Sequence, residues 1–270
     1  DAAMGWTESG KANFTGVSYL SRSMTKPALV AYMESHDEER IGYSNPTWGN
    51  TSNPLYATRK LPVACQRAEL GAAFFFTIPG PKMVWQFGEL NYDYKIEYNG
   101  RTGEKPIKWD YYYNPNRQRL YEAYAALIAL KTKLNAFNSS NYTLNLAAKV
   151  KTIAIDDTVV KVRIIGNFDL YAQAGVLTFP STGYWYNYMT GDSINVTSAE
   201  TTFNLQAGEY LILTNIRLKN PNIIDAPKAM DVNIAGDIMV KKSATESTDQ
   251  DLVAFYTYFD ANKDVEGASK

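Results

Sequence analysis

Two short apolar runs, each leading into acidic residues, constrain the fold of this chain most. The first spans residues 28–33 and is followed by the charged stretch 34–40, and the second spans residues 83–87 and ends at Gly88 and Glu89. A continuous apolar run bounded in this way is typical of a strand that is buried on both faces of a parallel sheet. Residues 57–76 lie between the two runs and carry apolar side chains at helical spacing. We therefore expect a strand, a helix and a second strand in succession.

A second helix is expected over residues 115–134. Asn114 is a suitable N-cap, and Pro115 fits the first helical position because it has no backbone N–H to leave unpaired. The repeating strand and helix pattern indicates an α/β architecture, and in (β/α) barrels the chemistry lies where the strands end. Residues 44–54 and 90–114 are rich in Asn, Gly and other loop formers, and we expect them to be long loops after the strands.

Residues 138–217 have a different sequence pattern from residues 1–137 and are strand-like throughout. Residues 159–165 alternate in twos, and turn signals recur at short intervals, for example at Gly166 and Asn167. Several short strands at this spacing predict an antiparallel β-sandwich domain. Residues 226–270 are polar, acidic and again strand-like. The expected fold class is therefore α/β plus all-β, with domains at 1–137, 138–217 and 226–270.

Charge and composition exclude several partners. Lys and Arg total 27 against 28 Asp and Glu, so a net charge of -1 gives no electrostatic reason to expect nucleic acid or an anionic membrane as a partner. No apolar run reaches the roughly 18 residues that a membrane span needs. The chain has one His and one Cys, and its acidic runs lack calcium-loop spacing, so we predict no metal site.

The loop after the first apolar run carries a recognisable motif. Residues 32–37 read Tyr-Met-Glu-Ser-His-Asp, and they resemble the end of the seventh barrel strand in the α-amylase family (glycoside hydrolase family 13). Residues 78–89, which end in Gly-Glu, are similar to the eighth strand of that family, and residues 103–110 to its lead into the eighth helix. The resemblance covers residues 1–217, and residues 33–40 look most like the variant found in Bacteroidetes-type amylases.

The resemblance implies a fold and a location. Residues 1–137 would be the C-terminal part of a (β/α)8 TIM barrel, carrying strands 7 and 8 with their helices. Residues 138–217 would be the β-sandwich that follows the barrel, and residues 226–270 resemble the first half of an immunoglobulin-like (Ig-like) module. The protein would be secreted or displayed on a bacterial cell surface.

The resemblance also implies site residues. Asp37 would be the carboxylate that stabilises the transition state in retaining hydrolysis of α-1,4-glucosidic bonds, and His36 would bind hydroxyls of the same sugar. Glu89 is either an orienting carboxylate or a structural one. Trp48 and Tyr92 either stack on glucose rings or pack within their loops. Four further charged residues of the motif are interpreted as a solvated loop network: Glu34, Glu38, Glu39 and Arg40.

The two other carboxylates of the family were not found. The 27 residues that precede the first expected strand are too few for the four to six strands that would carry them, because one βαβ unit alone takes about 30 residues. We therefore expect this chain to be a fragment that is inactive by itself, from a parent enzyme acting on α-glucan. No cofactor is expected within it, although a full-length parent could hold Ca²⁺.

Two alternatives remain open at this stage. The parent could be a glucanotransferase or branching enzyme, because these residues do not distinguish water from a sugar as the acceptor. It could instead be a non-catalytic glucan-binding scaffold that kept the barrel, although the intact His36 and Asp37 disfavour this.

Overall fold

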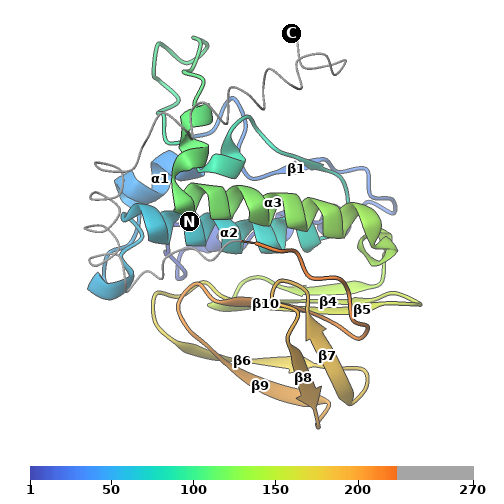
Figure 1. Cartoon of the computed structure of the whole chain (residues 1–270). Helices are drawn as coiled ribbons and strands as arrows, with labels where there is room; N and C mark the ends of the chain where they lie inside the picture. Colours follow the sequence, from blue (N-terminus) through green and yellow to red (C-terminus); the bar gives the residue numbers. More distant parts are fainter. Residues whose placement is uncertain (224–270) are drawn as a thin grey trace, which may run out of the picture. The chain divides into compact units, whose positions relative to one another are not determined.

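The computed structural model describes residues 1–223 (Figure 1), so the Ig-like module predicted over 226–270 lies outside the described residues. The first part contains three α-helices: α1 (Ile41–Trp48), α2 (Leu61–Thr77) and α3 (Pro115–Lys133). Short 3-10 turns precede, separate and follow the helices: η1 (Gly10–Ala12), η2 (Thr15–Val17), η3 (Leu20–Arg22), η4 (Pro54–Tyr56), η5 (Gly88–Leu90), η6 (Trp109–Tyr113) and η7 (Asn135–Asn138). Within residues 1–223, none of the helices combines the length and the apolar character that crossing a membrane requires.

The two expected strands form a parallel pair. Strands β1 (Ala31–Tyr32) and β2 (Lys82–Met83) align Ala31 with Lys82, and α2 lies between them in the chain. The prediction of strands buried on both faces is wrong, because Val30 is 54% and Tyr32 45% exposed. Among residues 1–223 each strand pairs only with the other, so neither strand has a second neighbour to cover its outer edge.

Helices α2 and α3 form as their sequences predict. Lys60 precedes α2 in extended conformation, and Pro62 occupies its first turn, where the missing N–H leaves no intrahelical bond unmade. The side chain of Asn114 accepts hydrogen bonds from the N–H groups of Asn116 and Arg117 and so caps α3. The two helices pack together, with the rings of Phe76 and Tyr124 edge to face at 5.3 Å.

Helix α1 was not predicted, because residues 44–54 were expected to be a loop throughout. Residues up to Trp48 are helical despite Pro46 inside the helix. Contacts with the rest of the chain compensate for this poor helix-forming sequence. Gly42 lies against the backbone of Asn91 and Tyr92, where a Cβ atom would come within 2.4 Å of both carbonyl oxygens. The short helix is therefore held by a close backbone approach that only glycine permits.

The second part is antiparallel and strand-rich. A six-stranded sheet has the order β3-β4-β5-β10-β7-β8, and β6 and β9 form a separate pair. The bounds are β3 (Tyr142–Asn145), β4 (Val150–Asp156), β5 (Lys161–Asn167), β6 (Gln173–Thr178), β7 (Gly183–Asn187), β8 (Ser193–Val196), β9 (Glu200–Leu205) and β10 (Tyr210–Thr214). A cluster of buried side chains joins the two sheets and includes Ile165, Leu177, Trp185 and Leu205.

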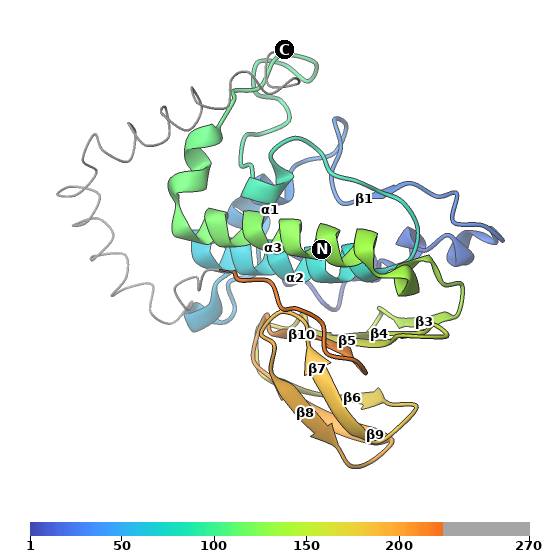
Figure 2. The ribbon, with the colours of Figure 1, turned by 45° about the vertical axis from the view of Figure 1, so that its right-hand side comes forward.

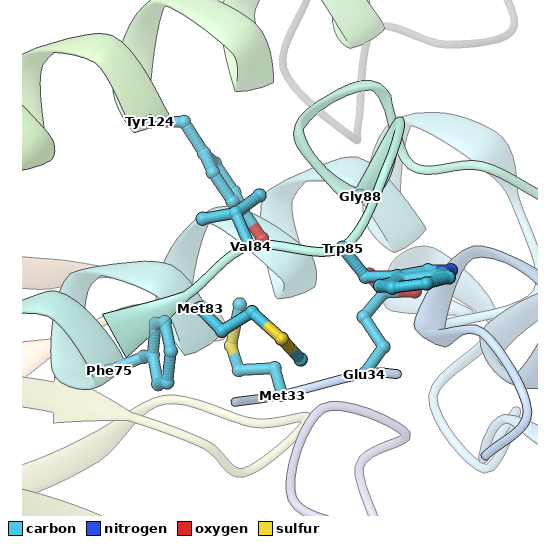
Figure 3. A pocket seen from close by; sticks show the side chains of 8 residues that line it. All are labelled: Met33, Glu34, Phe75, Met83, Val84, Trp85, Gly88 and Tyr124. Atoms are coloured by element: carbon cyan, nitrogen blue, oxygen red, sulfur yellow. The ribbon is translucent and has the colours of Figure 1, made fainter. Parts of the chain in front are cut away.

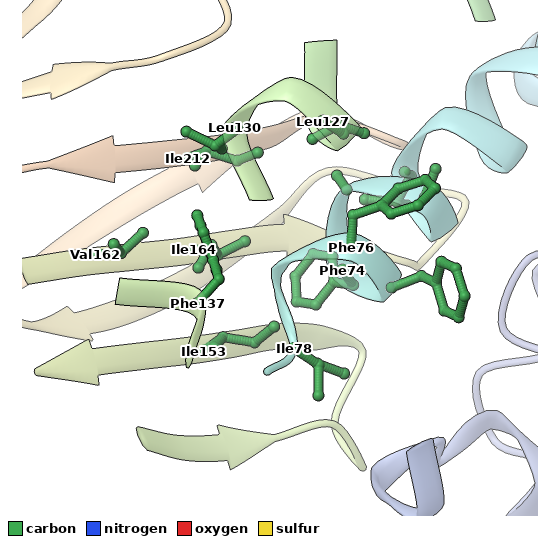
Figure 4. Packing of buried hydrophobic residues seen from close by; sticks show 14 of the residues in the cluster. Phe74, Phe76, Ile78, Leu127, Leu130, Phe137, Ile153, Val162, Ile164 and Ile212 are labelled. Carbon is green, nitrogen blue, oxygen red and sulfur yellow. The ribbon is translucent and has the colours of Figure 1, made fainter. Parts of the chain in front are cut away.

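The main hydrophobic core lies between the two helices and the six-stranded sheet. Figures 1 and 2 show α2 and α3 side by side above this sheet. Figure 4 shows the side chains of this interface, which come from α2 and the residue after it, α3, η7 and strands β4, β5 and β10. The labelled residues are Phe74, Phe76, Ile78, Leu127, Leu130, Phe137, Ile153, Val162, Ile164 and Ile212. The helical part and the sheet therefore share one core.

The closest approach in this core generates a prediction. A Cβ atom on Gly166 would lie 2.5 Å from the Phe74 ring and 2.8 Å from Leu70. We expect Gly166→Ala to lower the free energy of unfolding by about 1–3 kcal/mol, because the packed core cannot yield space for a methyl group. Urea unfolding measures this change. The control is Gly10→Ala, since Gly10 faces open space. Equal stability of the two variants would contradict the packing.

Candidate functional site

His36 and Asp37 lie side by side in the turn that follows β1. Their side chains are 71% and 64% exposed, and His36 Nε2 is 3.2 Å from Asp37 Oδ2. The hydroxyl of Ser35 shapes this turn, because it accepts a hydrogen bond from the Asp37 backbone N–H and donates one to Glu38. The structure thus presents an imidazole and a carboxylate together to solvent, directly beyond the end of a parallel strand.

The loop that follows β2 is attached to this turn. The guanidinium of Arg101 donates to the backbone carbonyl of Asp37 at 2.5 Å, and the Ile96 N–H donates to the Glu39 carboxylate at 2.7 Å. The ring of Trp85, which also follows β2, is centred 5.8 Å from the His36 ring. The two segments beyond the strand ends therefore form one surface, as the parallel pairing of β1 and β2 requires.

The prediction of a solvated charge network is wrong for Glu34 and Arg40. These residues are only 4% and 7% exposed. Arg40 Nη1 lies 3.7 Å from Glu34 Oε2 and donates to the Gln86 carbonyl at 2.9 Å. The turn folds back on itself, so Glu34 and Arg40 at its two ends point inward while His36 and Asp37 between them point outward. Periodicity could not show this, because the segment has neither helical nor strand repeat.

Burial dominates the electrostatics around Glu34. It raises the pKa of the Glu34 carboxyl from 4.5 to about 7, although the Arg40 guanidinium and a hydrogen bond from the Ile41 amide oppose the increase. Burial also raises the pKa of the nearby Glu89. Glu34 Oε2 is buried without a hydrogen-bond partner, which is costly in a low-dielectric interior.

A small cavity adjoins the Glu34 side chain. Figure 3 shows its lining, which comes from the two strand ends and from helices α2 and α3. Its volume is about 10 Å³, room for about one water molecule. The lining residues are Met33, Glu34, Phe75, Met83, Val84, Trp85, Gly88 and Tyr124.

The other predicted site residues have different settings. Glu89 is half-buried in η5, close enough to Glu34 and Arg40 for its charge to influence both of their pKa values. Trp48 lies at the end of α1 and not in a loop, and it is 48% exposed. Its ring meets that of Tyr43 edge to face at 5.6 Å. Trp48 therefore keeps a face open to a ligand.

Of the two alternatives for Tyr92, stacking on a sugar and packing within its loop, the structure shows the packing. It is 1% exposed. Its ring stacks against Phe87 at 5.6 Å and against Tyr94 at 5.2 Å, and its hydroxyl donates to the Pro106 carbonyl. The Arg40 guanidinium lies 5.1 Å from the ring centroid. A dense aromatic cluster thus occupies both sides of the ring that a sugar would need.

Sequence reasoning also missed the backbone strain beside the site. Phe87 adopts a left-handed conformation with φ of 62°, and Asn91 one with φ of 52°. Such a conformation is unfavourable for a bulky side chain and persists only where surrounding contacts impose it. The two residues flank η5, so the turn that carries Glu89 is held in shape at an energetic cost. Within residues 1–223, no group of three or more His, Cys, Asp or Glu side chains is arranged to hold a metal ion.

Comparisons with known proteins give fold relationships. No family model matches the sequence, and neither does any curated protein. An α-amylase from Anoxybacillus is similar in structure, with a TM-score of 0.55 and 15% identity over 78% of this chain and 44% of its own. A gamma-CGTase from alkalophilic Bacillus clarkii has a TM-score of 0.54 and 15% identity over 73% of this chain and 28% of its own. The α-amylase GTA from Geobacillus thermoleovorans, complexed with acarbose, has a TM-score of 0.52 and 13% identity, covering 70% of this chain and 39% of that one.

These likenesses establish the fold of the chain. The chain spans less than half the length of each of the three solved structures.

The setting of Glu34 predicts how stability depends on pH. Between pH 4.5 and about 7 the folded chain binds more protons at Glu34 than the unfolded chain does, so the free energy of unfolding falls as pH rises through this window. The stabilisation is on the order of 3 kcal/mol below pH 4.5 and is lost above pH 7.

Urea unfolding of the wild type and Glu34→Gln between pH 4.5 and 8 measures this contribution. We expect the variant to lose this fall in stability, while Glu200→Gln on exposed β9 keeps the wild-type pH dependence. Parallel curves for the wild type and Glu34→Gln would show that Glu34 does not titrate in this window.

Proposed function

We propose that this chain is the C-terminal part of an enzyme that hydrolyses α-1,4-glucosidic bonds with retention of configuration. In this proposal β1 and β2 are the last two strands of a (β/α)8 barrel, and residues 138–217 form the domain that follows it. The parallel pair with α2 as its crossover supports the assignment, as does the fold likeness to α-amylases. The observation that carries the proposal is the exposed His36 and Asp37 pair directly beyond β1.

Asp37 would act on the sugar at the cleavage point. Glycoside hydrolysis passes through an oxocarbenium-like transition state, and a fixed carboxylate stabilises the charge that develops there. Because the carboxylate is exposed and its backbone carbonyl is held by Arg101, Asp37 can accept hydrogen bonds from sugar hydroxyls without losing its place. His36 would donate to hydroxyls of the same sugar, and the exposed Trp48 would offer an apolar face to a further ring.

Nucleophile and acid/base would come from residues outside this sequence. A retaining glycosidase needs two carboxyl groups about 5–5.5 Å apart, and neither role is assigned to a carboxylate of this chain. Glu89 would serve as an orienting carboxylate, because its charge influences Arg40. Calcium binding by the full-length parent and secretion to the medium or cell surface stay predictions.

Replacement of Asp37 tests the proposal in the full-length enzyme. We expect Asp37→Asn to lower kcat on soluble starch by at least about 100-fold, because the variant loses charge stabilisation in the transition state. Circular dichroism should show an unchanged fold, since Asp37 is exposed. The matched control is Asp192→Asn in the exposed turn before β8, which should keep turnover within about twofold. Near-normal turnover by Asp37→Asn would contradict the assigned role.

A second candidate function is glucanotransfer, which the fold likeness to a gamma-CGTase favours. Products formed from maltoheptaose separate the two reactions. A hydrolase yields shorter maltooligosaccharides and a matching rise in reducing ends, because water is the acceptor. A transferase yields longer or cyclic products with little gain in reducing ends. We expect the hydrolytic pattern from the full-length enzyme and no product from the 270-residue chain alone.

A further inference from the structure

The Glu34 carboxyl group occupies a tightly enclosed place between the two strand ends. On one side lies Gly88, where a Cβ atom would come within 2.7 Å of Glu34 Oε1. On the other side Oε2 is buried without a hydrogen bond, 3.7 Å from Arg40 Nη1. Glutamine has the same shape as glutamate and carries no charge to desolvate. A carboxylate here bears a desolvation cost when it is ionised, and the charge of the buried Arg40 offsets that cost in part.

Glu34 is linked to the exposed His36 and Asp37 pair in two ways, along the chain and through space. Along the chain, Glu34 is two residues before His36 and three before Asp37. Through space, its counterion Arg40 donates to the Gln86 carbonyl and lies 5.8 Å from the centroid of Trp85. The ring of Trp85 in turn faces His36 at 5.8 Å. Glu34 and Arg40 thus form a buried ion pair beneath the turn. Arg40 connects the turn to the segment after β2.

We propose that Glu34 is a positioning residue, whose carboxylate holds Arg40 and thereby fixes where His36 and Asp37 stand. This inference rests on the proposed function for its effect on turnover. Its structural part, the link between Glu34 and the turn, concerns this chain alone.

Charged and titratable groups face Glu34 from each neighbouring element. Arg40 lies at the end of the turn, Glu89 on η5, Tyr124 on α3, and Tyr92 lies beyond Arg40. Burial raises the pKa of the Glu34 carboxyl to about 7, so the group is largely neutral below pH 6 and largely ionised above pH 8. Glu34→Gln therefore imitates the wild type at low pH and differs from it at high pH.

The first experiment follows the turn in this chain by nuclear magnetic resonance (NMR). In a His36→Gln background, which takes the neighbouring imidazole out of the pH series, backbone amide signals are recorded between pH 5 and 9. We expect the Ile41 amide, which faces the Glu34 carboxyl, and the amides of residues 35–37 to shift with a common midpoint near pH 7. Glu34→Gln should abolish this shift, whereas Glu200→Gln should retain it. A shift at Ile41 without one at residues 35–37 would overturn the positioning role.

The second experiment measures turnover by the full-length enzyme. We expect Glu34→Gln to lower kcat about 10-fold at pH 8 and less than twofold at pH 5.5, with KM nearly unchanged. Because Glu34→Gln leaves the buried Arg40 without its counterion, the melting temperature at pH 8 should fall as well, so kcat is measured well below it, where the variant stays folded. A purely structural role would lower the melting temperature and leave kcat of the folded variant unchanged, so a wild-type kcat at pH 8 would overturn the proposal.

The two experiments separate the possible failures. If residues 35–37 follow Glu34 in the NMR titration but Asp37→Asn has normal turnover, the proposed function is wrong while the positioning link stands. If Asp37→Asn is inactive but Glu34→Gln has wild-type kcat at pH 8, the proposed function stands and the positioning role is wrong.

Discussion

Helix α2 is the element on which the rest of the structure depends, because it is buried on nearly every side. Its Phe74, Phe75 and Phe76 are each at most 3% exposed, and consecutive helical positions point in different directions, so the helix must be covered all round. The six-stranded sheet covers one side and α3 another. The fully buried Arg67 of α2 donates to carbonyls of Ala3 and Phe168 and joins the N-terminal segment to the sheet.

The same helix is also the crossover between β1 and β2, and this places the candidate site. Two residues of parallel pairing hold the two chain segments in register. Beyond the strand ends, side chains hold the two segments together. Arg101 and Glu39 connect the two loops by hydrogen bonds. A short sheet supplemented by such contacts can orient an exposed His36 and Asp37 pair without burying it.

The polar groups buried below this surface disfavour folding. Glu34 and Arg40 are withdrawn from water at a distance longer than a hydrogen bond, and the turn beside them carries a strained Phe87. Each of these features disfavours folding, and the large core between helices and sheet compensates for them. Under the proposed function, such local costs are consistent with a preorganised site, whose groups are held in place before a ligand arrives.

The sequence by itself determined the elements whose signals are local. Asn114 and Pro115 predict the start of α3 through capping, alternation and turn residues predict an antiparallel region over 138–217, and the run before Glu34 predicts a strand. Only the tertiary structure decided the helicity of α1, the burial of Glu34 and Arg40, and the enclosed ring of Tyr92. These outcomes depend on segments brought together from distant positions, such as Gly42 against Asn91 and Arg40 against Gln86. Burial depends on such contacts between distant segments, so a local sequence pattern cannot predict it.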